Sequence, residues 1–313
     1  MDVQGRLSCA SLARSTILVE DEIVKGLPLQ SRNFSFPYNS GTVMPVSLDQ
    51  IVRSTRGKVA EAKRTADLRE MERSAEQHVP RGFRRALQAK SRDGVAVIAE
   101  LKKASPSKGL IRAEFCVEKL AVELEAAGAA ALSVLTDEEF FQGSRENLRK
   151  ASAAVKVPCL RKDFIVDEFQ LVEARANSAD AVLVIVAALT EEELAGLARG
   201  ARSRGLDVLC EVHDEEELGR AMDAGCDMIG VNTRDLRTFR VDAETAMRLA
   251  EKLPANVLKV AESGIRSGED IARLRAAGYD AFLIGETLMR ADSPGVALRG
   301  LVASTEYRVP SGQ

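Results

Sequence analysis

The sequence predicts a single (β/α)8 TIM barrel, and two patterns beyond residue 95 carry this prediction. Short runs rich in Val, Ile and Leu alternate with amphipathic stretches long enough to be crossover helices. A weak repeat, beginning at Ala127, Ser178, Gly225 and Gly278, recurs about every 50 residues, the length of two strand-helix units. Apolar strands with helical crossovers are typical of parallel sheets covered on both faces. Eight units favour a closed barrel, and no Gly-x-Gly-x-x-Gly follows the first strand to indicate a doubly wound sheet.

Eight short apolar segments are the predicted barrel strands, and the amphipathic segments between them are the predicted helices. The strands are expected at residues 95–102, 130–135, 159–162, 181–186, 208–212, 228–231, 258–261 and 282–284. The helices include residues 117–127, 168–177, 191–204, 215–224, 243–253 and 268–276.

The region before the barrel pattern divides into two parts. Residues 1–43 show no sustained period and fit neither a signal peptide nor a transit peptide. We expect them to be an N-terminal extension, either disordered or the product of a misassigned translation start, with a targeting or regulatory role left open. Residues 44–313 are the predicted catalytic domain. It is expected to begin with a helix capped by Ser47, followed by a charged helical stretch over 58–75 and a short helix over 84–89.

Composition argues against several classes of function. With 44 Lys and Arg against 47 Asp and Glu, the net charge of -3 provides no field that attracts nucleic acid or an anionic membrane. No apolar stretch approaches the roughly 20 residues that span a bilayer. The five cysteines are odd in number and widely spaced, so we expect reduced thiols in a cytoplasmic protein. Because there are only two histidines, no metal site is expected, and lysines and carboxylates are the candidate proton carriers.

Polar residues follow the predicted strands at their C-terminal ends, where barrel enzymes place their reacting groups. Glu100 and Lys102 share one face of the first strand because side chains alternate with period two. Arg161 and Lys162 must face opposite ways, and Lys162 is the predicted inward group, with Asp163 as its charge partner. The strand-end groups together are Glu100, Lys102, Lys162, Asp163, Glu211, Asn232, Arg234, Glu262, Ser263, Gly264, Gly285 and Glu286. A structural ion pair would explain any one of them, whereas their joint occurrence predicts an enzyme.

Two turns that contain Gly264 and Gly285 follow the last two strands and predict a phosphate site. Backbone N–H groups in these loops can approach an anion, and this is the usual phosphate position in the fold. Lys102 or the turn at residues 105–107 is expected to close the opposite side.

Two further positions lie near the predicted site without a firm role. Phe141 follows the second strand, where it could form an apolar wall for an aromatic substrate or simply pack within its loop. His213 shares the face of Glu211 near a strand end, and we assign it no role because such a histidine is more often a hydrogen-bonding spacer.

Six motifs, in order along the chain, resemble indole-3-glycerol-phosphate synthase, an enzyme family of tryptophan biosynthesis. They are AELKKASPSKG at 99–109, LTDEEFFQGS at 135–144, LRKDFI at 160–165, EVHDEEEL at 211–218, GVNTRDL at 230–236 and AESGI at 261–265. The resemblance covers nearly all of residues 44–303. It implies ring closure of 1-(2-carboxyphenylamino)-1-deoxyribulose 5-phosphate to indole-3-glycerol phosphate, with loss of carbon dioxide and water. It implies a carboxy-lyase with a phosphorylated small-molecule substrate and no cofactor or metal, and we expect a monomer or weak homo-oligomer.

The resemblance implies roles for five catalytic residues. Lys162 would be the general acid at the substrate ketone, held and polarised by Glu211. Lys102 would meet the substrate carboxylate and donate the proton with which the hydroxyl group leaves as water. Glu100, steadied by Asn232, would be the base of the dehydration and would stabilise positive charge on the amine nitrogen.

The resemblance also implies a set of binding residues. The substrate-binding set is Ser105, Phe141, Phe164, Arg234, Leu236, Glu262 and Ser263, of which Phe141, Phe164 and Leu236 would line the anthranilate side. Gly264, Gly285 and Glu286 would bind the phosphate, with Ser105 beside them. Some relatives have a small hydroxyl residue in place of Glu286, so we expect its backbone N–H to face the ligand and its carboxylate to turn away. The helices over residues 47–89 would cap the substrate side of the barrel.

Two other functions are weighed against this one. Lys162 or Lys102 could form a Schiff base, as in aldolases, although the neighbouring carboxylates favour the protonated ammonium over an amine nucleophile. A phosphate-ligand binder or subunit interaction module would bind a ligand without turnover. Borohydride trapping and a Lys162→Met variant distinguish these alternatives.

Overall fold

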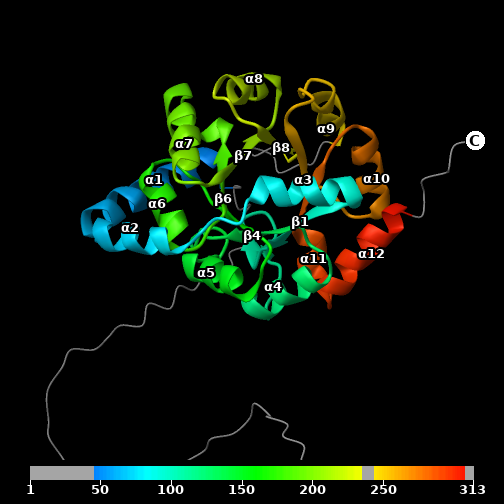
Figure 1. The fold of residues 1–313 in the computed structure, drawn as a ribbon, viewed down its shortest axis with the longest axis horizontal. Coiled ribbons are helices and arrows are strands. Elements are labelled where there is room, and N and C mark those ends of the chain that lie inside the picture. Colours follow the sequence, from blue (N-terminus) through cyan, green and yellow to red (C-terminus); the bar gives the residue numbers. More distant parts are fainter. Residues whose placement is uncertain (1–45, 235–242, 307–313) are drawn as a thin grey trace, which may run out of the picture. The chain divides into compact units, whose positions relative to one another are not determined.

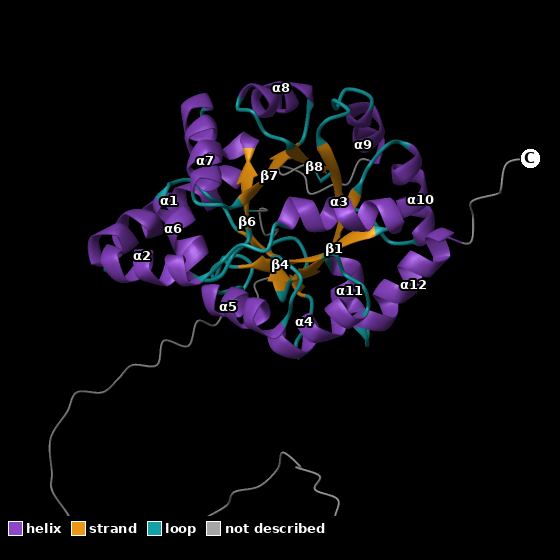
Figure 2. Cartoon of the chain, viewed as in Figure 1, coloured by secondary structure: helices purple, strands orange, loops and turns teal. Residues whose placement is uncertain are grey.

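A computed structural model of the chain describes residues 46–234 and 243–306. Eight parallel strands close into a barrel whose hydrogen-bonded order is β1-β10-β9-β8-β7-β6-β5-β4, surrounded by helices (Figures 1 and 2). The strands are β1 (Ala96–Leu101), β4 (Ala131–Leu135), β5 (Cys159–Lys162), β6 (Ala181–Ile185), β7 (Asp207–Val212), β8 (Met228–Asn232), β9 (Leu258–Glu262) and β10 (Ala281–Ile284). The predicted (β/α)8 fold is therefore confirmed.

The outer helices follow the strands in the alternation that the sequence predicts. They are α4 (Val117–Ala126), α5 (Arg145–Ala154), α6 (Phe169–Ala176), α7 (Glu191–Ser203), α8 (Glu215–Asp223), α9 (Ala243–Ala250), α10 (Gly268–Ala276), α11 (Glu286–Arg290) and α12 (Pro294–Glu306), with a 3-10 turn η1 (Val186–Ala188). Helices α5, α11 and α12 were not among the ranges named from the sequence. Ser144 supplies the N-cap of α5 by accepting a hydrogen bond from the Asn147 N–H. In the described part of the chain, no helix combines the length and the apolar character needed to cross a bilayer.

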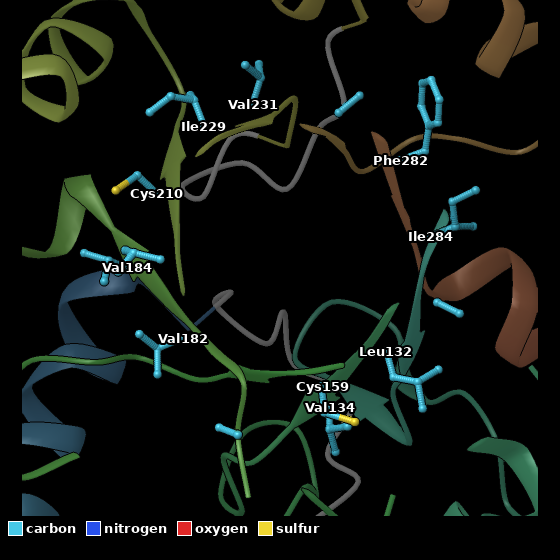
Figure 3. Packing of buried hydrophobic residues seen from close by; sticks show 14 of the residues in the cluster. Leu132, Val134, Cys159, Val182, Val184, Cys210, Ile229, Val231, Phe282 and Ile284 are labelled. Carbon is cyan, nitrogen blue, oxygen red and sulfur yellow. The ribbon is translucent and has the colours of Figure 1, made fainter. Parts of the chain in front are cut away.

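Strand side chains alternate between the helical layer and the barrel interior. Figure 3 shows the outward set, which includes Val182, Val184 and Phe282, directed away from the barrel axis and into the larger hydrophobic cluster. The inward set, which includes Leu160 and Leu183, forms a second cluster inside the barrel. Because β5 has this alternation, Leu160 and Lys162 share the interior face, and the strand delivers its last side chain to the barrel mouth.

The predicted position of helix α3 (Phe83–Asp93) at the substrate side is wrong. Phe83 and Leu87 are completely buried, and they belong to the same cluster as the inward-facing strand residues. The Arg84 backbone N–H donates to the carboxylate of Asp207, the first residue of β7, at 2.9 Å. Helix α3 therefore closes the N-terminal end of the barrel, opposite the strand ends that carry the polar groups, and it crosses the barrel in Figure 1.

The other two N-terminal helices differ from each other in position. Helix α1 (Leu48–Thr65) lies at the C-terminal side, since Lys58 pairs with Glu139 after β4 and Lys63 pairs with Asp167 after β5. Helix α2 (Leu68–Gln77) packs instead against α6. The charged stretch predicted over 58–75 is thus two helices, and the break falls where Asp67 caps α2.

The cysteine prediction is partly wrong. Cys210 on β7 and Cys226 before β8 form a disulfide, with their Cα atoms 6.5 Å apart. Cys116 and Cys159 are free thiols, and burial raises the pKa of Cys159 to about 12. The remaining cysteine, Cys9, lies outside the described residues.

Candidate active site

A cavity of about 580 Å³ opens at the C-terminal ends of the strands. This volume lies in the range of small-molecule sites. All of the predicted site residues line it except Leu236, which lies outside the described residues. They are Glu100, Lys102, Ser105, Phe141, Lys162, Phe164, Glu211, Asn232, Arg234, Glu262, Ser263, Gly264, Gly285 and Glu286.

Lys162 lies at the centre of the charged cluster. Its Nζ donates to Glu211 Oε2 at 2.8 Å and lies 3.6 Å from Glu262 Oε2. Burial alone would lower the pKa of Lys162, but the negative charges of Glu211, Glu262 and Glu100 outweigh burial and hold the pKa well above its ordinary value. The side chain, which is 14% exposed, is therefore an ammonium ion.

The partner predicted for Lys162 was wrong. Asp163 accepts a hydrogen bond from Arg161 Nη2 at 2.9 Å and another from the Thr136 hydroxyl. Because Arg161 faces the helical layer, where it also meets Glu173 at 2.7 Å, Asp163 belongs to a structural ion network and not to the lysine. The two strand neighbours thus have opposite surroundings, as period-two alternation requires.

Glu211 is held by hydrogen bonds to both of its oxygens. Oε2 accepts from Lys162, and Oε1 accepts from Asn232 Nδ2 at 3.0 Å. Burial raises the pKa of Glu211, but the positive charges of Lys162 and His213 outweigh burial and lower the pKa far below its ordinary value. Asn232 was expected to steady Glu100, whereas its amide contacts Glu211 and its oxygen accepts from the Ser263 hydroxyl at 2.8 Å.

Glu262 has the opposite electrostatic character to Glu211. Burial, together with the charges of Glu211 and Glu100, raises the pKa of Glu262 to about 8, although Lys162 acts in the other direction. Its Oε1 has no hydrogen-bond partner in the described structure. That oxygen lies against Gly230 on β8, where a Cβ atom would come within 2.1 Å of it, so only glycine leaves room for this carboxyl group.

The first strand supplies an acid and a base that contact each other. Lys102 Nζ donates to Glu100 Oε1 at 2.5 Å, so the pair predicted from alternation shares one cavity. A Cβ atom at Gly285 would lie 2.2 Å from Glu100 Oε1. Gly285 therefore makes space for the Glu100 carboxylate, in addition to its expected position beside a phosphate.

The rim near Gly285 is cationic, with one carboxylate among the cations. Glu286 accepts from Arg290 Nε at 3.0 Å, and its oxygens lie 3.8 Å from Lys108 Nζ and 3.9 Å from Arg234 Nη2. We expected this carboxylate to turn away from the ligand. In the structure it lies among three cations that all line the cavity, and its direction relative to a bound ligand stays a prediction. Sequence reasoning missed Lys108 and Arg290 as site residues, although Lys108 stands within the motif at 99–109.

Part of the cavity lining is apolar. The rings of Phe141 and Phe164 lie with centroids 6.1 Å apart and tilted by 40°. Leu135 and Ile185 line the cavity with them. The cavity therefore offers apolar side chains to an aromatic ring and cations to an anion, and the Lys162 cluster lines the same cavity.

Comparison with known proteins identifies the family of the chain. The sequence model of the indole-3-glycerol phosphate synthase family matches residues 48–301. The chain belongs to this family. A synthase of this name from Koribacter versatilis (strain Ellin345) is 62% identical over 259 residues, which cover 83% of this chain and 100% of the relative. The synthase from Polaromonas naphthalenivorans (strain CJ2) is 47% identical over 256 residues, covering 81% of this chain and 97% of the relative.

Solved structures that are distant in sequence share the fold of this indole-3-glycerol phosphate synthase family member. KGPDC from Streptococcus mutans superposes with a TM-score of 0.54 at 12% identity, covering 69% of this chain and 100% of that one. Thiamine phosphate pyrophosphorylase from Pyrococcus furiosus gives a TM-score of 0.51 at 18% identity, covering 71% and 100%. At such low identity these likenesses show the barrel architecture alone.

Proposed function

We propose that the chain closes the indole ring of 1-(2-carboxyphenylamino)-1-deoxyribulose 5-phosphate and releases indole-3-glycerol phosphate, carbon dioxide and water. The observation that carries this proposal is the Lys162 ammonium, in a cavity that the rings of Phe141 and Phe164 and the cationic rim also line. Such a cavity suits a substrate with an aromatic ring at one end, a phosphate at the other and a ketone between them. Membership of the family supports the same reaction.

Lys162 is the proposed general acid of the ring closure. When the aryl carbon attacks the ketone, negative charge develops on the carbonyl oxygen and requires a nearby proton donor. An alkoxide is more basic than an amine, so transfer from the Lys162 ammonium is favourable even though the carboxylates raise the pKa of this lysine. Glu211, in contact with Nζ at 2.8 Å, holds the ammonium in place during this step.

Lys102 and Glu100 are the proposed pair for the later steps. Lys102 pairs with the substrate carboxylate until the bond between this carboxylate and the ring breaks and carbon dioxide leaves. It then donates a proton to the departing hydroxyl group, which leaves as water. Glu100 removes the proton that the ring system loses in this dehydration. Because Glu100 contacts Lys102, the two groups can exchange this proton.

The binding residues are proposed to orient the two ends of the substrate. Phe141, Phe164 and Leu236 contact the anthranilate ring. Backbone N–H groups at Gly264, Gly285 and Glu286 bind the phosphate, and Ser105 approaches it from the β2–β3 hairpin (Ala104–Ser105 and Gly109–Leu110). Arg234, Glu262 and Ser263 complete the polar wall between these ends.

A fluorescence assay for product formation from the carboxyphenylamino ketose tests this function. We expect turnover by the full-length chain and equal turnover by a chain that starts at Met44. Turnover without any borohydride-trapped adduct supports proton transfer by Lys162, and a trapped covalent adduct would instead establish the Schiff-base alternative. Ligand binding without turnover would refute the proposed activity.

We also propose that residues 44–313 are the catalytic domain and that the protein acts in the cytoplasm as a monomer or weak homo-oligomer. A biosynthetic enzyme needs access to the metabolites of its pathway, which supports this location. Cell fractionation tests the location, and sedimentation velocity over a range of concentrations tests the oligomeric state. Recovery in the membrane fraction, or a stable oligomer at low concentration, would contradict these proposals.

A further inference from the structure

His213 lies beside the catalytic cluster but has no part in the proposed proton transfers. It follows β7 by one residue and stands two positions after Glu211. Its side chain is 15% exposed, and its contacts lie with carboxylates on both sides. A histidine in this position can act on the reaction only through the groups that it touches.

Glu217 clamps His213 from the helix side. Glu217 Oε2 accepts from the backbone N–H of His213 at 2.8 Å and lies 3.0 Å from its Nδ1. Glu217 is itself fixed, because its N–H donates to the Asp214 side chain that caps α8, at 2.9 Å. The orientation of the imidazole ring is therefore set by the start of a helix.

The other ring nitrogen of His213 is directed at Glu211. Nε2 is buried and lies 3.5 Å from Glu211 Oε1, the oxygen that also accepts from Asn232. Burial would lower the pKa of His213, but Glu211 and Glu217 outweigh burial and raise the pKa to about 10. The ring is therefore an imidazolium near neutral pH, held between one carboxylate of the site and one outside it.

We propose that His213, clamped by Glu217, is a positioning residue that presents a second cation to Glu211 and fixes this carboxylate against Lys162. The inference rests on the proposed function, since it concerns the acid of the same ring closure. Glu211 then shares its charge between the imidazolium and the Lys162 ammonium. Without His213, the negative charge of Glu211 would act on Lys162 alone. The Lys162 ammonium would then hold its proton more tightly, so the lysine would be a weaker acid.

The charged groups around the ring determine how its titration responds to substitution. Glu217 from α8 and Glu211 from β7 contact the ring directly. Lys162 and Glu262 lie beyond Glu211. Replacing Glu217 with Gln removes a negative charge and should lower the imidazole pKa. Replacing Lys162 with Met removes a positive charge and should raise it.

The test combines steady-state kinetics with NMR titration of the imidazole rings. His213→Gln should lower kcat about tenfold, the effect of about one pKa unit on the acid, while KM changes by less than about twofold. The chain has two histidines, so a His78→Gln variant assigns both ring signals. We expect the His213 ring to remain protonated at pH 8 and its pKa to fall in Glu217→Gln, which retains an oxygen acceptor.

His78→Gln is also the matched control for stability. The His78 side chain is likewise 15% exposed, and its Nε2 contacts the buried carboxylate of Asp180, just before β6 and so at the other end of the barrel. Equal kcat in His213→Gln and His78→Gln, or a neutral His213 ring at pH 8 in the wild-type protein, would overturn the positioning role. A wild-type protein that forms no product would instead refute the proposed function, so the two failures are distinguishable.

Discussion

The buried carboxyl group of Glu262 provides a sharp prediction about stability. Its pKa is about 8, against an ordinary value of 4.5, because burial and the neighbouring carboxylates disfavour its charged form. Between these two values the unfolded chain has released this proton while the folded chain retains it. A raised carboxyl pKa therefore contributes stability below about pH 4.5, and that contribution is lost as the pH rises toward 8.

The magnitude follows from proton linkage. One proton of difference between the folded and unfolded states gives a slope of about 1.4 kcal/mol per pH unit in the free energy of unfolding. Glu262→Gln keeps the shape of the protonated carboxyl group and cannot ionise. We therefore expect the wild-type protein to lose stability relative to this variant by about 1.4 kcal/mol for each pH unit across this interval.

Urea unfolding at half-unit steps from about pH 5 to pH 8 measures this difference. Glu192→Gln, on the exposed face of α7, is the matched control, and its pH dependence should follow that of the wild-type protein. Parallel stability curves for wild type and Glu262→Gln would show that Glu262 is ionised in the folded protein throughout this range, and would contradict its raised pKa.

Three further substitutions test other parts of the structure. Gly285→Ala places a methyl group against Glu100 and should reduce kcat at least about tenfold. The control Gly300→Ala, whose added methyl group meets nothing within 4 Å, should leave kcat unchanged, and equal rates for the two variants would contradict the packing. Leu87→Ala should lower the free energy of unfolding by about 2–5 kcal/mol in chemical denaturation, with kcat retained, because α3 closes the end of the barrel away from the site. Glu286→Gln should lower KM several-fold, since the carboxylate competes with phosphate for the rim cations; an unchanged or raised KM would show that it does not.

Alternation along the strands made much of the site predictable. Period two placed Glu100 with Lys102 and Arg161 opposite Lys162, and the parallel topology brought the strand ends to one mouth. The choice of Lys162 as the inward group was confirmed, although the Asp163 partner on which it rested was wrong. The hydrogen-bond partner of each group was harder to predict from the sequence. The sequence placed Asn232 in the cavity, but whether its amide reaches Glu100 or Glu211 depends on side-chain directions across neighbouring strands, which periodicity does not specify.

The N-terminal helices show a second limit. Phe83 and Leu87 lie four residues apart, and this spacing indicates one apolar face without indicating which surface that face covers. A sequence pattern does not distinguish the two open ends of a barrel. The Cys210–Cys226 disulfide was missed for a similar reason, because pairing depends on Cα separation in the fold and not on spacing along the chain.

The role of Lys162 as the acid is tested most directly by turnover and ligand binding of Lys162→Met, measured beside Lys103→Met. Lys103 is a near neighbour that does not line the cavity, so its substitution controls for the loss of a lysine in this region. We predict that Lys162→Met loses nearly all product formation while still binding the phosphorylated substrate, and that Lys103→Met retains both. Product formation by Lys162→Met at the wild-type rate would contradict the assignment of this ammonium as the acid.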